Sequence, residues 1–141
     1  IDAMRLKVNY IKSSNVWPEI KMDIGKIREA LSIIIENAVK YNFHRGVINI
    51  SNKVIDNNLV LEIESTGVGI TPEERSNLFN KLFYRSKRAQ EKNPIGMGIG
   101  LQVAKAIISG HKGRIDIDSY GENYGAKVEI ILPINPYYEA L

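Results

Sequence analysis

Hydrophobic and polar positions alternate along several stretches in the way that β-strands require. Residues 5–11 and 19–23 alternate in this manner, and "SSNVWP" between them is rich in turn-forming residues. Residues 46–55 and 59–65 also have the pattern of strands, and "DNN" between them is typical of a hairpin turn. On the second strand of this hairpin, Ser65 shares a face with apolar residues, because strand side chains alternate between the two faces. We therefore expect Ser65 to point toward the core side of a sheet.

The strongest helical pattern covers residues 24–41. Asp23 can cap its N-terminus, because a carboxylate accepts hydrogen bonds from the free N–H groups of the first turn. Five apolar residues recur at helical spacing and predict the buried stripe: Ile27, Leu31, Ile34, Ile35 and Ala38. A second helix is expected over 98–110, opened by glycines and closed by Gly110.

Other parts of the chain give weaker signals. A short helix is expected after Thr71, with Pro72 at its first position. Residues 80–97 contain five Lys or Arg and no clean periodicity, which predicts a mobile loop. Two more strands are expected, over 113–120 and 126–133. The order of these elements predicts a single α/β domain over 1–141, with residues 134–141 as a tail.

Composition narrows the range of functions. A chain of 141 residues can bury a core without disulfides or a structural metal. It has no cysteine and two histidines, His44 and His111, which excludes disulfides and the usual zinc clusters. The net charge of +3 is too small to argue for nucleic acid. A reducing, cytoplasmic setting is compatible with these numbers.

The apolar runs and the first residues of the sequence bear on whether the chain enters a membrane. No apolar run approaches the roughly 18 residues that a membrane span needs, and the first residues lack the apolar core of a signal peptide. The sequence begins with Ile rather than Met, so we expect a fragment or a processed piece. A segment that anchors the parent protein in a membrane could lie outside it.

Three short motifs carry candidate chemistry. The first, "ENAVKY", places Asn37 on the flank of the helical apolar stripe and Lys40 close to it. An amide carbonyl can join the oxygen ligands of Mg²⁺, and a lysine can meet phosphate. The alternative is an ordinary, partly exposed amide near the end of a helix.

The second motif is "TGVGI", which follows Ser65. Gly67 and Gly69 permit positive φ and the close approach of backbone to a flat ligand. A turn between strand and helix that needs glycine only for its geometry would have the same composition, so the motif alone leaves both interpretations open.

The third motif, "GMGIGL", places Gly96, Gly98 and Gly100 at the start of the second long helix. Free N–H groups and the helix dipole favour phosphate there. It is neither a Rossmann fingerprint, since no strand leads directly into it, nor a P-loop, since Gly-Lys-Ser/Thr is absent. A flexible hinge is the alternative.

Together and in this order the motifs are far more specific. The chain resembles the ATP-binding catalytic domain of sensor histidine kinases, within the superfamily that includes gyrase-type and heat-shock-chaperone ATPases. The resemblance runs from about residue 20 to 133 and rests on five segments: "REALSIIIENAVKYN", "ESTGVGI", "LFNKLFYRS", "GMGIGL" and "SYGENYGAKVEIILP". It implies a Bergerat-type two-layer α/β sandwich, in which a mixed five-stranded sheet packs on about three helices, with a flexible ATP lid at about 80–97.

The resemblance also implies residue roles. Asn37 would bind Mg²⁺, Lys40 and Tyr41 would lie near the phosphates, and Arg85 would be a lid cation that reaches the terminal phosphate. Asn37, Lys40 and Arg85 are thus the expected catalytic residues. The other residues expected to bind or border ATP are Ser65, Gly67, Gly69, Ile70, Phe83, Gly96, Gly98, Gly100 and Leu101. Phe79 and Phe83 would also anchor the lid.

Two positions depart from the family pattern. Where relatives carry an Asp that accepts a hydrogen bond from the adenine amine, this chain has Ser65, a shorter and neutral acceptor. One helical turn before Asn37, where gyrase and chaperone relatives carry a catalytic Glu, it has Ile33, which cannot take a proton. We expect weaker ATP binding and no hydrolytic base at Ile33.

Three functions follow from the resemblance. The leading one is a histidine kinase catalytic domain that presents the γ-phosphate of Mg-ATP to a histidine on a separate dimerisation domain, with a response regulator downstream. Ser65 and Ile33 motivate a second, a degenerate module that binds or scaffolds. The third is a free-standing kinase of the anti-sigma type. His44 and His111 are both expected to be structural rather than phosphoacceptors.

Overall fold

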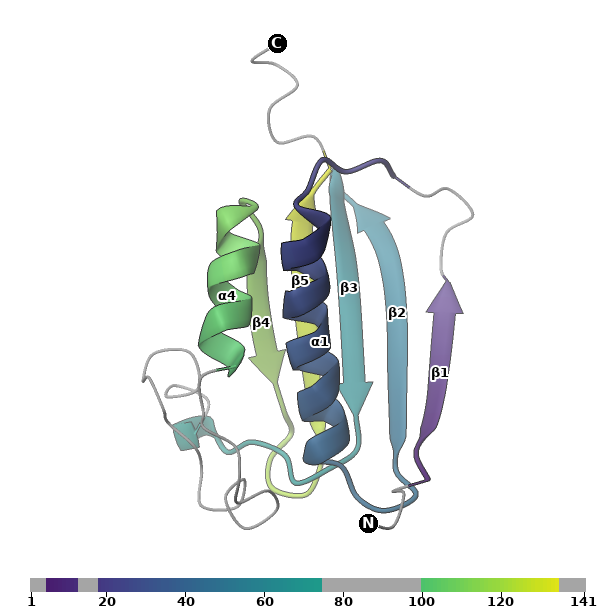
Figure 1. The fold of residues 1–141 in the computed structure, drawn as a ribbon. Helices are drawn as coiled ribbons and strands as arrows, with labels where there is room; N and C mark the ends of the chain where they lie inside the picture. Colours follow the sequence, from purple (N-terminus) through teal and green to yellow (C-terminus); the bar gives the residue numbers. More distant parts are fainter. Residues whose placement is uncertain (1–4, 13–17, 75–99, 135–141) are drawn as a thin grey trace.

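The computed structural model describes residues 5–12, 18–74 and 100–134. Within these residues, five strands form one mixed sheet in the order β1-β2-β3-β5-β4 (Figure 1). β1 runs parallel to β2, and all other neighbouring strands are antiparallel. The strands are β1 Lys7–Lys12, β2 Val47–Ile55, β3 Asn58–Ser65, β4 Arg114–Asp118 and β5 Ala126–Pro133.

Two long helices, α1 (Ile24–Lys40) and α4 (Gly100–Gly110), lie side by side on one face of this sheet (Figure 1). They run in opposite directions, so the end of α1 and the start of α4 reach the same end of the sheet. The mixed five-stranded sheet covered by helices confirms the predicted α/β sandwich.

None of the helices in the described part is both long and apolar enough to cross a membrane.

The N-terminus of α1 forms as its sequence predicts. The carboxylate of Asp23 accepts a hydrogen bond of 3.1 Å from the backbone N–H of Lys26. Ile27 and Ile34 of the predicted stripe are buried, but Ile35 is 37% exposed, and Ala30 takes its place in the core. The buried face is therefore rotated away from Ile35 toward Ala30, while Leu31 and Ala38 pack partly against the core.

The β2–β3 hairpin confirms the predicted turn. Asp56 and Asn57 both have positive φ, 50° and 63°, which is the type I′ geometry that fits the twist of a two-residue hairpin. Its register pairs Ile48 with Ser65 and Ile50 with Ile63. Since Ile48 and Ile63 are buried, Ser65 lies on the core side of the sheet, as expected.

The strand expected over 19–23 is wrong. These residues form no strand and lead directly into the Asp23 cap of α1. Met22 packs against the hydrophobic core while Lys21 stays exposed. The alternation of buried and exposed residues is present, but an extended segment that crosses a core shows it without pairing to another strand.

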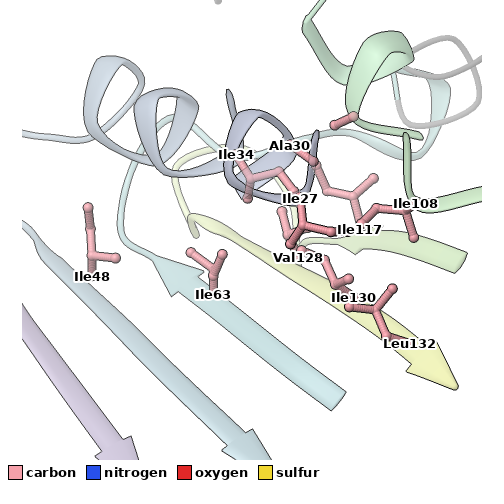
Figure 2. Packing of buried hydrophobic residues seen from close by; sticks show 11 residues of the cluster. Ile27, Ala30, Ile34, Ile48, Ile63, Ile108, Ile117, Val128, Ile130 and Leu132 are labelled. Atoms are coloured by element: carbon pink, nitrogen blue, oxygen red, sulfur yellow. The ribbon is translucent and has the colours of Figure 1, made fainter. Parts of the chain in front are cut away.

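The core lies between the helices and the sheet (Figure 2). Ala30 and Ile34 of α1 and Ile108 of α4 are almost completely buried against strand residues such as Ile130. Full burial of an isoleucine side chain stabilises the fold by roughly 1.5–3 kcal/mol. This layer therefore sets the positions of the two helices relative to the sheet, and with them the positions of the candidate site residues.

Candidate functional site

Three of the sequence motifs meet at one end of the sheet. The C-terminal end of α1, the turn that follows β3 and the N-terminal end of α4 all reach this end (Figure 1). The backbone N–H of Val68 in the turn donates to the carbonyl of Tyr41 just after α1, at 3.1 Å. The structure thus brings together the end of α1, the turn after β3 and the start of α4, which are far apart in the sequence.

Asn37 lies one helical turn before the end of α1. Its side chain is partly exposed and makes no hydrogen bond to any residue in the described ranges, so its amide oxygen is free to bind a ligand. Lys40 is exposed and lies 3.9 Å from the Glu36 carboxylate, an ion pair of little energetic weight at a surface. Tyr41 caps the helix through its N–H, which donates to the carbonyl of Asn37 at 3.1 Å.

The turn after β3 requires its glycines. Gly67 has φ 147° and Gly69 has φ 73°, conformations that other residues rarely adopt. A Cβ on Gly67 would collide with the carbonyl oxygen of Tyr41, and one on Gly69 with that of Gly121. Both contacts are to the protein's own backbone, so close packing alone accounts for these two glycines. Whether they also border a base stays a prediction.

Ser65 lies at the end of β3, between Ile48 and Ala126 in the neighbouring strands. It is partly exposed, and its hydroxyl makes no side-chain hydrogen bond within the described residues. It is thus available to a ligand on the helix side of the sheet. The backbone N–H of Ile70, in contrast, already donates to the Ser119 hydroxyl at 3.1 Å, so this N–H is not available to a ligand.

The first described residue of α4 lies against α1. A Cβ on Gly100 would be 3.0 Å from Cγ2 of Ile33, which is tighter than ordinary packing. Leu101 follows it and packs partly against the core. Since Ile33 and Asn37 are four residues apart, Asn37 lies on the flank of α1 that faces the start of α4. The other predicted site residues, Phe83, Arg85, Gly96 and Gly98, and the anchor Phe79, lie outside the described residues.

A cavity of about 250 Å³ lies at the same end of the sheet but not at Asn37. Its lining includes Asn49, Glu64, Lys127 and Asp118, which the strand register places in one row. The adjacent row, which contains Ile48 and Ser65, faces the helices, so this row faces the other way. The cavity thus opens on the other face of the sheet, but its lining also includes Ser65, so it borders one end of the predicted nucleotide site.

The residues present fit a magnesium nucleotide. The described part of the chain contains no group of three or more His, Asp or Glu that could hold a metal ion by itself. Mg²⁺ does not need one, because it is commonly bound by one or two protein oxygens together with substrate phosphates and water. The free oxygen of Asn37 matches this requirement, and the nearby Lys40 has the charge to meet phosphate.

The two histidines differ in their surroundings. Both ring nitrogens of His111 bond to backbone: Nδ1 is 2.8 Å from the carbonyl of Ile107, and Nε2 accepts from the N–H of Asp23 at 3.0 Å. This confirms the structural role expected for His111, which joins the end of α4 to the start of α1. His44 is exposed in the loop between α1 and β2.

Sequence reasoning missed Asn42, Thr66 and Ser119. Asn42 is completely buried, and its Oδ1 accepts from the Thr66 hydroxyl at 2.6 Å. Thr66 is the first residue of the glycine motif, and Asn42 and Ser119 lie in segments that carry the family resemblance, but the alternation and spacing of residues carry no information about their partners. The sequence alone does not distinguish a polar residue that is bonded beside a glycine turn from one that is simply exposed at the surface.

With this geometry established, the comparisons with known proteins define the class. Residues 22–136 match the family model described as histidine kinase-, DNA gyrase B- and HSP90-like ATPase. The match covers most of the chain, which therefore belongs to this ATPase family. The resemblance inferred from the motifs is confirmed.

Individual relatives are sensor kinases. The chain is 31% identical over 124 residues to the sensor protein DltS of Streptococcus agalactiae, a match that covers 88% of this chain and 30% of DltS. The structure is similar to the Acinetobacter baumannii histidine kinase AdeS, with 30% identity and a TM-score of 0.70, covering 94% of this chain and 56% of that one. The chain spans about 20–30% of the length of the curated relatives it matches.

A third similarity concerns the fold alone. Full-length ShkA, solved in complex with AMPPNP, has a TM-score of 0.77 and 23% identity, over 92% of this chain and 26% of that one. The ligand named there is an ATP analogue bound to that protein. The agreement of these folds confirms the predicted fold class.

Proposed function

We propose that this chain is the ATP-binding catalytic domain of a sensor histidine kinase. It presents the γ-phosphate of Mg-ATP to a histidine on a separate dimerisation domain of the same parent protein, and a response regulator then receives the phosphoryl group. One observation carries the proposal: the free amide of Asn37 lies on the flank of α1 that faces the start of α4, beside the glycine turn. Membership of the ATPase family and the sensor kinases among its relatives support it.

Each part of the site has a separate task in this proposal. Asn37 would bind Mg²⁺ through its carbonyl oxygen, and Lys40 would neutralise phosphate charge together with Arg85 of the predicted lid. The free N–H groups at the start of α4 would face the phosphates. Bound Mg²⁺ neutralises the charge on the transferred group, so the protein contributes mainly positioning and electrostatic stabilisation. The proposed site of action is the cytoplasm, where ATP is available.

The test is magnesium-dependent nucleotide binding to this fragment. Isothermal titration should show ATP binding with Mg²⁺ and much weaker binding with EDTA. Asn37→Ala should remove most of the magnesium-dependent part. Ser32→Ala, a substitution at an exposed position on the same helix, is the control and should bind like the wild type.

The proposal also predicts what the isolated fragment does not do. With radiolabelled ATP it should not label itself, because His111 is bonded on both ring nitrogens and the acceptor histidine lies on another domain. Label should appear on a histidine-bearing dimerisation domain supplied separately. Stable label on His44 or His111 would contradict this arrangement.

A degenerate module is the second candidate, because Ser65 replaces a charged acceptor and Ile33 supplies no base. No binding of ATP or GTP, with or without Mg²⁺, would favour it over the kinase. An anti-sigma-type kinase has no observation of this structure in its favour.

A further inference from the structure

Two hydroxyl side chains attach the glycine turn 66–70 to the elements on either side of it. At one end, the Thr66 hydroxyl donates to Oδ1 of Asn42 at 2.6 Å and accepts from the backbone N–H of Val47 at 2.8 Å. At the other end, the Ser119 hydroxyl accepts from the N–H of Ile70 at 3.1 Å. All three bonds join segments that are far apart in the sequence.

At the Thr66 end, an exposed threonine bonds to a buried and tightly packed asparagine. Asn42 has no exposed surface, and its Oδ1 also accepts from the N–H of Phe43 at 2.8 Å. A Cβ on Gly46 would collide with the side chains of both Asn42 and Thr66, so there is no space for this pair to shift toward the loop. Because Asn42 follows the end of α1 directly, Thr66 sets the position of the turn relative to the helix that carries Asn37.

The Ser119 end joins the turn to the loop between β4 and β5. The Ser119 hydroxyl donates to the carbonyl of Gly125 at 2.6 Å, and it accepts from the N–H of Gly121 at 3.1 Å. Two backbone bonds add to this connection, from Gly125 to the carbonyl of Gly67 at 3.1 Å and from Asn123 to that of Val68 at 2.8 Å. The turn is therefore attached on one side to the segment after α1 and on the other to the loop between β4 and β5.

We propose that Thr66 and Ser119 are positioning residues for nucleotide binding. This inference rests on the proposed function. A nucleotide that spans the site must contact the turn with its base and the flank of α1 with its phosphates at the same time. Thr66 and Ser119 hold these two surfaces at one spacing before the ligand arrives, which lowers the entropy lost on binding.

The physical cost of losing either hydroxyl follows from the hydrogen bonds that it makes. In Thr66→Val the shape is kept, but the buried oxygen of Asn42 and the N–H of Val47 each lose a partner. The turn can then move relative to Asn37. We expect the dissociation constant of Mg-ATP to rise about tenfold in Thr66→Val and in Ser119→Ala.

The experiment compares four variants with the wild type, at a temperature where all are folded. Mg-ATP is titrated into Thr66→Val, Thr66→Ser, Ser119→Ala and Leu132→Val. Thr66→Ser keeps the hydroxyl and should bind within about twofold of the wild type.

Leu132 is buried and pairs with Leu59 at the opposite end of β3, so Leu132→Val should lower the melting temperature without weakening binding. Amide exchange at 67–70 in the nucleotide-free protein should be faster in Thr66→Val and Ser119→Ala.

The outcomes separate this inference from the proposed function. If the wild type binds Mg-ATP and Thr66→Val and Ser119→Ala bind equally well, the positioning role is overturned while the proposed function stands. The same holds if Leu132→Val loses as much affinity as they do, since the effect would then follow stability alone. If the wild type binds no nucleotide, the proposed function fails, and the positioning role fails with it.

Discussion

Gly100, the first described residue of α4, lies against Ile33 of α1, so closely that a Cβ on Gly100 would be 3.0 Å from Cγ2 of Ile33. Ile33 is thus an aliphatic side chain that packs on the first described glycine of the second helix, one turn before Asn37. Ile33 therefore has a packing role in this structure, and Gly100 has a steric reason to lack a side chain.

The first prediction concerns this contact. Gly100→Ala should push the start of α4 away from α1 and weaken Mg-ATP binding by roughly three- to tenfold, equivalent to about 1 kcal/mol of strain. Ile33→Ala removes the atom that the new methyl group meets, so the loss should be smaller in the Ile33→Ala background. Titration of both single variants and the double variant measures the coupling. Strict additivity would show that the two residues do not interact.

The second prediction concerns Ser65. Ser65→Asp should raise ATP affinity by on the order of ten- to thirtyfold, because hydrogen bonds to a charged acceptor are stronger than those to a neutral one. Selection of ATP over GTP should rise as well, since a carboxylate accepts from the amine of adenine and repels the carbonyl of guanine. Isothermal titration with both nucleotides measures this. Unchanged ATP affinity would show that Ser65 does not contact the base.

The third prediction concerns the glycine turn. Gly69→Ala should lower the free energy of unfolding by on the order of 2 kcal/mol or more, because φ is 73° and the new Cβ meets the carbonyl of Gly121. Gly110→Ala is the matched control. Gly110 ends α4 with nothing within 4 Å of a built Cβ, so its substitution should be neutral or slightly stabilising. Urea denaturation distinguishes the two, and equal effects would contradict the steric argument.

The fourth prediction concerns His111. His111→Ala removes the acceptor for the N–H of Asp23 and should lower the free energy of unfolding by about 1–2 kcal/mol. His44→Ala removes an exposed imidazole from a loop and should change it by less than about 0.5 kcal/mol. Thermal denaturation of both variants measures the difference. A similar melting temperature for the two would show that the bond between α4 and α1 contributes little.

Much of the fold was predictable because its signals are local. The Asp23 cap, the length of α1 and the Asp56–Asn57 turn depend on residues within a few positions of one another. The strand expected over 19–23 was wrong for the complementary reason. Alternation describes the exposure of a segment, whereas membership of a sheet depends on a partner strand elsewhere in the chain.

In the candidate site, too, local sequence signals were predictable and contacts between distant residues were not. The sequence by itself determined the family and the residue types of the motifs, because glycines, Asn37 and Lys40 are recognisable at their spacings. Only the tertiary structure decided which groups remain free, with Asn37 unbonded within the described residues and the N–H of Ile70 already bound. It also placed Thr66 against Asn42, 24 positions away, and His111 against Asp23, 88 positions away. Such partners are set by the packing of helices on the sheet, which no local pattern of residues specifies.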